Sequence, residues 1–155
     1  MENPLVGTWS LLGWYNQTDE GEKLYPLGDD ATGYISYSSD GFVFVHIMAS
    51  NRVNFAVNDP FGGSIPEDSR AFKSHITYAG RYEFQGHRVI HPATQASCPN
   101  WIGTEQIREV EFPGKTLRLS AAGATFQGYS VSVTAFVDWE RATTSCDQLG
   151  SVPRS

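Results

Sequence analysis

The sequence contains few cysteines, few charged residues and no long apolar run. Its two cysteines, Cys98 and Cys146, lie outside any Cys-x-x-Cys arrangement, so their spacing indicates neither a metal site nor a redox pair. The apolar stretches are only a few residues long, whereas a membrane-spanning helix needs about 20. Charged residues make up 18% of the 155 residues, and the formal net charge is −6. With no basic stripe, this charge disfavours nucleic acid and anionic membranes as partners.

The motifs of nucleotide and hydrolase chemistry are also missing. The chain has no GxSxG, P-loop, GxGxxG or HExxH pattern, and the glycine-rich segment 59–63 lacks the flanking Lys of a phosphate cradle. We therefore expect no cofactor. Residues 1–4 show no basic segment followed by an apolar one, so we expect no secretory signal, a cytoplasmic location and reduced thiols.

Aromatic residues, by contrast, are abundant. Four Trp, seven Tyr and nine Phe make up 13% of a chain whose length suits one domain. Aromatic rings with a polar tip suit the wall of a cavity that is apolar yet offers a few hydrogen bonds. The alternative for most of them is that they fill a β core.

The pattern of β-formers and turn residues predicts an all-β barrel. Eight runs are expected as strands, namely 5–15, 32–37, 42–48, 78–84, 88–95, 104–112, 116–121 and 129–140. Eight antiparallel strands close into a barrel that holds one small ligand. Pro66, Glu67 and Asp68 predict the start of a short helix over about 66–76, placed to act as a lid or plug.

Several motifs, in order along the chain, resemble the bacterial and fungal lipocalin-like domain family. They are Leu5–Trp9, Pro26–Asp29, Thr32–Ile35, Tyr82-Glu83, Ile90-His91, Pro99–Arg108 and Trp139–Arg141. The resemblance implies a lipocalin-like barrel over 1–142. The Ser/Thr-rich and then Gly/Pro-containing composition after Arg141 predicts a flexible tail at 143–155. The resemblance also implies a structural role for Arg108, tying strand to loop. Pro92 stands where the family often has a second His, and it removes a strand hydrogen-bond donor, which suggests an edge or a bulge.

Within the run 42–48, side chains alternate between two apolar faces. Phe42, Phe44, His46 and Met48 share one face, and we take that face to line the cavity. His46 would then be an acid–base group in an apolar pocket. His91, beside Val89 and Ala93 on one strand face, and Asp138 are the other catalytic candidates. For each histidine the alternative is a core residue satisfied by a neighbour.

The aromatic and polar residues of the predicted strands and loops supply the expected ligand contacts. Tyr34, Tyr78, Tyr82 and Tyr129 are phenols that could donate to a ligand. His46, His75 and His91 have no i,i+2 or i,i+4 spacing with one another, so no metal site is expected. The expected ligand-binding residues are Phe42, Phe44, Met48, Tyr34, His75, Tyr82, Trp101 and Phe136.

Three functions remain open from the sequence. The first is binding of a small apolar or aromatic metabolite inside the barrel, as a carrier or sensor. The second is a cofactor-free isomerase, cyclase or dehydratase, because related barrels are recruited for such reactions in natural-product pathways. The third is an interaction module that forms a homodimer through its apolar strand faces.

Overall fold

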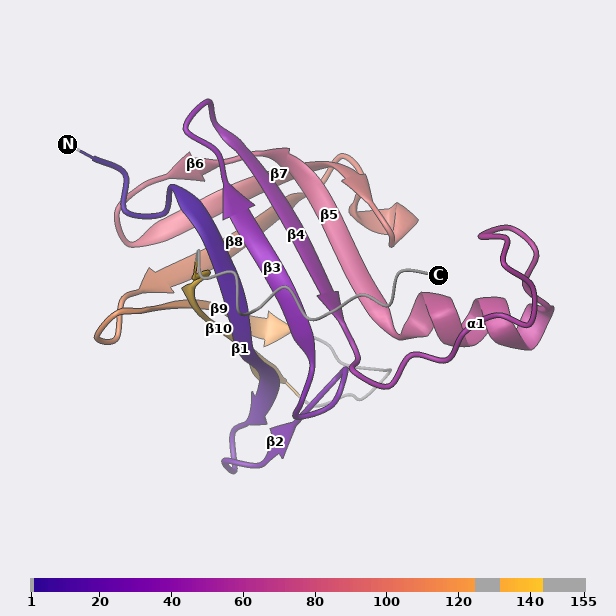
Figure 1. Ribbon diagram of the computed structural model, residues 1–155. Coiled ribbons are helices and arrows are strands. Elements are labelled where there is room, and N and C mark those ends of the chain that lie inside the picture. Colours follow the sequence, from indigo (N-terminus) through magenta and orange to yellow (C-terminus); the bar gives the residue numbers. More distant parts are fainter. Residues whose placement is uncertain (1, 125–131, 144–155) are drawn as a thin grey trace.

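Eight antiparallel strands close into a barrel in the computed structural model, which describes residues 2–124 and 132–143 (Figure 1). The strand order is β10-β9-β8-β7-β5-β4-β3-β1, and β1 pairs with β10 to close the barrel. The barrel strands are β1 (Gly7–Thr18), β3 (Thr32–Tyr37), β4 (Phe42–Met48), β5 (His75–Arg81), β7 (Arg88–Ala96), β8 (Glu105–Glu111), β9 (Thr116–Ala124) and β10 (Val133–Arg141). Short strands β2 (Lys23–Leu24) and β6 (Glu83–Phe84) pair with β1 and β7.

The predicted fold class is therefore confirmed, and the predicted strands correspond to the barrel strands in number and order. Positions 129–131 of the last predicted strand and almost all of the expected tail at 143–155 lie outside the described residues. So does Tyr129.

The period of two along β4 decides which side chains enter the barrel. Val43, Val45 and Ile47 are buried, while Phe44 and Met48 are exposed. A closed barrel has a single interior, so one of two apolar strand faces must point outward. The face of β4 that we expected to line the cavity is the outer one.

One end of the barrel is closed by the N-terminal segment. Leu5 is fully buried there, and its carbonyl accepts a hydrogen bond of 2.9 Å from the indole of Trp9. The guanidinium of Arg141 lies over the Trp9 ring and donates to the carbonyl oxygens of Pro4 and Val6. The first and last motifs of the sequence, Leu5–Trp9 and Trp139–Arg141, thus contact each other at the closed end of the barrel.

Pro92 lies inside the sheet, between β5 and β8, and not at an edge. The register of β5 against β7 shifts between Ala79 and Gly80, directly beside this proline. A Cβ on Gly80 would overlap the carbonyl oxygen of Pro92, so the close approach of the two strands requires glycine here.

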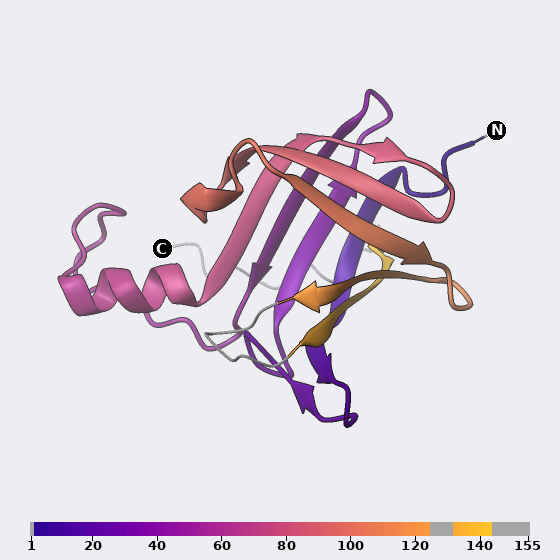
Figure 2. The same cartoon turned by 180° about the vertical axis from the view of Figure 1, so that it is seen from behind.

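The helix α1 (Ile65–Lys73) begins with a capping box in which Ser64 and Glu67 exchange side-chain and backbone hydrogen bonds. Backbone hydrogen bonds from Ser64 and Ala56 lower the pKa of the Glu67 carboxyl. No residue of α1 is buried, and the helix projects from the end of β5 away from the strands (Figures 1 and 2). It therefore does not plug the barrel. Among the described residues no helix is long and apolar enough to cross a membrane.

Candidate ligand cavity

The barrel encloses a cavity of about 440 Å³, a volume suited to one small molecule. Its wall is mostly aliphatic and aromatic, with a small number of polar side chains. The described residues that line it are Trp14, Asn16, Ile35, Val45, Ile47, Ile76, Tyr78, Trp101, Gln106, Arg108, Leu119, Ala121, Ala122, Gly123, Ala135, Val137 and Trp139.

Two buried polar atoms on this wall have no hydrogen-bond partner among the described residues. They are the amide oxygen Oδ1 of Asn16, on β1, and the indole Nε1 of Trp139, on β10. Asn16 is 4% exposed and Trp139 is 1% exposed, so water does not reach either from outside. Buried polar groups are nearly always paired, so two unpaired ones on residues of the cavity wall mark a place where the side chains around the ligand space are not fully satisfied.

Arg108 brings a positive charge to the cavity from β8. Its guanidinium donates to the carbonyl oxygen of Ile107 at 2.8 Å and to Oε1 of Gln106 at 3.2 Å. Within the described part of the chain it forms no ion pair, since the ion pair found there joins Arg118 and Asp138. Both acceptors lie on β8 itself, so these two hydrogen bonds do not tie the strand to a loop directly, and the implied structural role stays a prediction. Arg108 also lines the ligand space.

His91 sits behind the cavity wall, held between two tyrosines. The hydroxyl of Tyr37 lies 2.9 Å from its Nε2, and the hydroxyl of Tyr78 lies 2.8 Å from its Nδ1. His91 is 0% exposed and Tyr37 is 1% exposed. Tyr78 is itself a wall residue, and the indole of Trp101 packs edge-on against its ring at 5.6 Å between centroids. These contacts fix the orientation of the imidazole completely.

Burial keeps this cluster uncharged. It lowers the pKa of His91 to about 3, with a further contribution from the charge of Arg108. Burial also raises the pKa of Tyr37 and Tyr78, which Arg108 partly opposes. All three groups therefore carry one exchangeable proton each near neutral pH.

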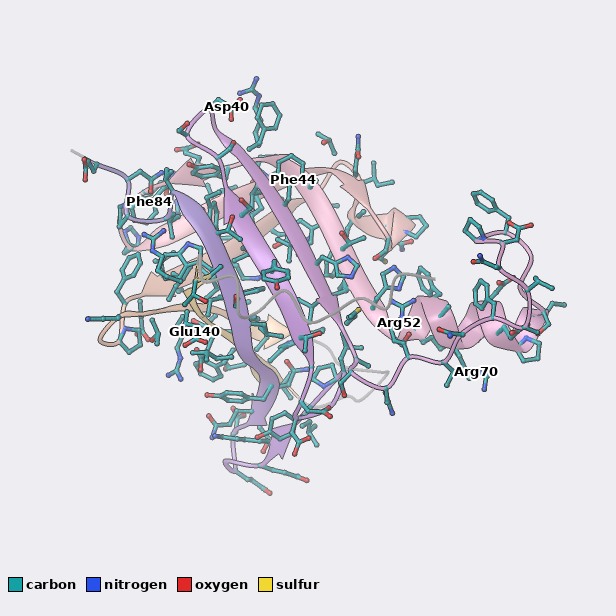
Figure 3. All side chains as sticks on the ribbon, viewed as in Figure 1. Asp40, Phe44, Arg52, Arg70, Phe84 and Glu140 are labelled. Carbon is teal, nitrogen blue, oxygen red and sulfur yellow. The ribbon has the colours of Figure 1, made fainter. Side chains whose placement is uncertain are left out.

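Of the eleven residues that the sequence proposed for the site, the structure brings few to the cavity. Trp101 lines it, and His91 touches it through Tyr78. Residues on the outer face of β3 and β4 lie outside it, and Figure 3 shows one of them, Phe44, on β4. These outer residues are Tyr34, Phe42, Phe44, His46 and Met48.

His46 and His75 stack on each other outside the cavity, with ring centroids 6.0 Å apart. Partial burial lowers the pKa of His46, and His75 and Arg52 lower it further. Nδ1 of His75 donates to the carbonyl oxygen of Ala71 in α1. His75 lines a separate hollow of about 210 Å³ that shares Trp14 and Ile76 with the main cavity.

Asp138 and Phe136 lie on the outer face of β10. Asp138 accepts two hydrogen bonds from Arg118, of 2.7 and 2.9 Å, and Phe136 stacks on Tyr15 with centroids 5.3 Å apart. Tyr82 packs edge-on against Tyr37, near the closed end, and donates to the carbonyl oxygen of Ser38. None of these three side chains lines the cavity.

The sequence reasoning missed Asn16, Tyr37, Gln106 and Trp139. Tyr37 shares a strand face with Ile35, and that alternation was a usable signal. Asn16 follows the predicted end of the first strand at residue 15, whereas β1 continues to Thr18. The described residues hold no group of three or more His, Cys, Asp or Glu that could bind a metal ion.

Three comparisons with known proteins gave matches. Residues 6–142 match the lipocalin-like domain family. A curated protein of Aspergillus oryzae, the 4'-hydroxy-3'-methoxypropiophenone carrier protein ppsC, is 38% identical over 66 residues, which are 37% of this chain and 60% of that protein. The chain thus matches less than two thirds of the relative's length. A solved structure of a mutant of the fluorescent protein UnaG aligns over 88% of this chain and 95% of its own, with 19% identity and a TM-score of 0.38.

Proposed function

Because the chain belongs to the lipocalin-like domain family and encloses an apolar cavity, we propose that it binds and carries one small, largely apolar aromatic metabolite. The observation that carries this proposal is the apolar cavity of about 440 Å³, whose wall residues Asn16 and Trp139 each hold a buried polar atom, Oδ1 and Nε1, without a partner among the described residues. One accepts a hydrogen bond and the other donates one, so a ligand with both kinds of polar group satisfies them.

The separation of these two residues along the barrel suits a ligand built on a substituted benzene ring. Asn16 pairs with Ala135 on β10, and Trp139 lies four residues further along the same strand. Four residues of strand span roughly 13 Å between Cα atoms. An aromatic ring with a hydroxyl at one end and a carbonyl-bearing chain at the other fits within that span.

The relative from Aspergillus oryzae supports this class of ligand. Its name gives it as a carrier of a phenolic aromatic ketone. Such a molecule has a phenol that can donate to Asn16 and a ketone that can accept from Trp139, Arg108 or Tyr78. We therefore propose phenolic ketones of natural-product biosynthesis as the ligand class, with the protein acting in the cytoplasm.

Cofactor-free isomerisation or cyclisation is the second candidate, and Arg108 favours it. A guanidinium that lines the cavity without a carboxylate partner among the described residues can stabilise negative charge that develops on a substrate oxygen. No carboxylate occurs among the described lining residues, and His91 is engaged at both ring nitrogens. The described lining residues thus provide no carboxylate or free imidazole that could accept a proton from a substrate, which favours carriage over catalysis.

Native mass spectrometry with 4'-hydroxy-3'-methoxypropiophenone tests the proposal. We expect one bound ketone per chain, and its loss in the variant Ala135→Phe, which adds a ring inside the cavity. The ketone is recovered unchanged if the protein is a carrier, whereas an isomeric product identifies an enzyme. The absence of binding to the parent protein would overturn both functions.

An interaction module that forms a homodimer is the third candidate, and its interface would lie on the outer face of β3 and β4. Tyr34 is 59% exposed, Phe44 is 55% exposed and Met48 is 36% exposed on adjacent strands β3 and β4. Exposed apolar side chains clustered in this way favour an interface. Sedimentation analysis of the parent chain and of Phe44→Glu decides between a monomer and a dimer formed by this face.

A further inference from the structure

The contacts around His91 leave one proton without a partner. Tyr37, His91 and Tyr78 are neutral and carry three exchangeable protons in total, whereas they form only two hydrogen bonds with one another. A neutral imidazole donates through one ring nitrogen and accepts through the other. One tyrosine therefore donates to His91, the other accepts from it, and the hydroxyl proton of the accepting tyrosine must find another acceptor.

The surroundings of the two phenols differ in a way that identifies the accepting tyrosine. Tyr37 is 1% exposed, packs against the ring of Tyr82 and has no second hydrogen-bond partner among the described residues. Tyr78 is a wall residue of the cavity. An unpaired O–H on Tyr37 would be sealed in the core, whereas Tyr78 belongs to the cavity wall, where a ligand can supply the missing acceptor.

We propose that His91 carries its proton on Nδ1, so that the hydroxyl of Tyr78 is free to donate to an oxygen of the bound ligand. The chain of hydrogen bonds then runs in one direction. Tyr37 donates to Nε2 of His91, Nδ1 of His91 donates to the oxygen of Tyr78, and Tyr78 donates to the ligand. Tyr37 and His91 are positioning residues that act through Tyr78.

This chain makes the cavity rich in donors. Tyr78 and Arg108, which carry O–H and N–H donors, both line the ligand space, and each hydrogen bond in the chain polarises the next. The site therefore selects a ligand with a carbonyl or phenolate oxygen over one without it. This inference rests on the proposed binding function and names its specificity-determining residue.

The tautomer is tested first, in the ligand-free protein. The ¹⁵N chemical shifts of His91 distinguish a protonated from an unprotonated ring nitrogen, and we expect a protonated Nδ1 at neutral pH. In Tyr37→Phe the donor to Nε2 is lost, so the proton is expected to move to Nε2, with Tyr78 now donating to Nδ1. A protonated Nε2 in the parent protein overturns the proposal.

Ligand selectivity is tested with three matched probes in calorimetric titrations. They are 4'-hydroxy-3'-methoxypropiophenone, the corresponding secondary alcohol, and the propyl compound in which CH₂ replaces the carbonyl. We expect the parent protein to prefer the ketone over the propyl compound by about tenfold. Tyr78→Phe removes this preference. Tyr37→Phe reduces the preference for the ketone by severalfold, although Tyr37 does not line the cavity. Tyr25→Phe is the control: it changes an exposed phenol and leaves the preference for the ketone unchanged.

The outcomes separate the two proposals. If all three probes bind equally well, the carrier function stands and the role of Tyr78 is overturned. If none binds, the carrier function is overturned, and with it the ligand selectivity assigned to Tyr78. If Tyr37 has only a structural role, Tyr37→Phe weakens the binding of all three probes by the same factor and leaves the ratio of their affinities unchanged. That result also overturns the proposal.

Discussion

The guanidinium of Arg141 lies over the ring of Trp9, with its central carbon 3.9 Å from the ring centroid. It also donates to the carbonyl oxygens of Pro4, at 2.7 Å, and Val6, at 2.6 Å, and so fastens the N-terminal segment over the closed end. We expect Arg141→Met, which keeps the aliphatic bulk, to lower the free energy of unfolding by about 1–2 kcal/mol in urea titrations.

Arg81→Met is the matched control for this change, because Arg81 stacks over the ring of Phe42 at 4.7 Å on the barrel exterior. Its effect on the free energy of unfolding is expected to stay within about 0.5 kcal/mol. Equal losses in the two variants would contradict the fastening role of Arg141.

Asn16 gives a prediction in which stability and binding change in opposite directions. Its Oδ1 is buried without a partner in the described residues, so the ligand-free protein is destabilised by an unpaired acceptor. Asn16→Leu is expected to raise the free energy of unfolding by about 1 kcal/mol and to weaken binding of a phenolic ligand by about tenfold. Thermal unfolding and calorimetry measure the two effects. A loss of stability would contradict the cost assigned to the unpaired acceptor, and unchanged affinity would show that Oδ1 has no role in binding.

The fold could be predicted from the sequence because strand alternation and turn residues are local signals. Asp40-Gly41 does separate β3 from β4, and Pro113-Gly114 does separate β8 from β9. Local signals cannot show which face of a strand points inward when both are apolar. In β4 the closure of the barrel decides this, and it places Val45 inside and Phe44 outside.

The site was harder to predict because it depends on contacts between distant residues. His91 was recognised as facing the same side as Val89 and Ala93, and all three are buried. Its two partners, however, come from β3 and β5, at sequence separations of 54 and 13 residues. The spacing of residues in one sequence does not reveal such a cluster. It forms because the adjacent strands β3, β4, β5 and β7 pair in one particular register.

We expect the fold to lose stability in acid because of His91. Its pKa is about 3 in the folded protein, against about 6.5 for an exposed histidine. Between these values the unfolded chain binds one more proton than the folded one, so the contribution to stability is complete above pH 6.5 and is lost as the pH falls toward 3. The free energy lost amounts to roughly 4–5 kcal/mol, at about 1.4 kcal/mol per pH unit.

His91→Gln removes this titration, so urea unfolding from pH 7 to pH 4 should show a shallower loss of stability than in the parent protein. His87→Gln changes an exposed histidine and should follow the parent curve. If the curves of His91→Gln and the parent run parallel over this range, His91 is not the group responsible.

Neighbouring residues on β4 provide the sharpest test of which strand face binds the ligand. Val45 is 5% exposed and lines the cavity, whereas Phe44 is 55% exposed and points outward. Val45→Phe adds a ring inside a cavity of about 440 Å³, and we expect it to weaken ligand binding by about tenfold or more. Phe44→Ser removes an aromatic ring from the outer face, and we expect ligand affinity to change by less than about twofold, since no wall atom moves. Calorimetric titration of both variants with the same phenolic ketone decides the matter. The reverse order of effects would mean that the ligand binds outside the barrel, on the face that carries Phe44.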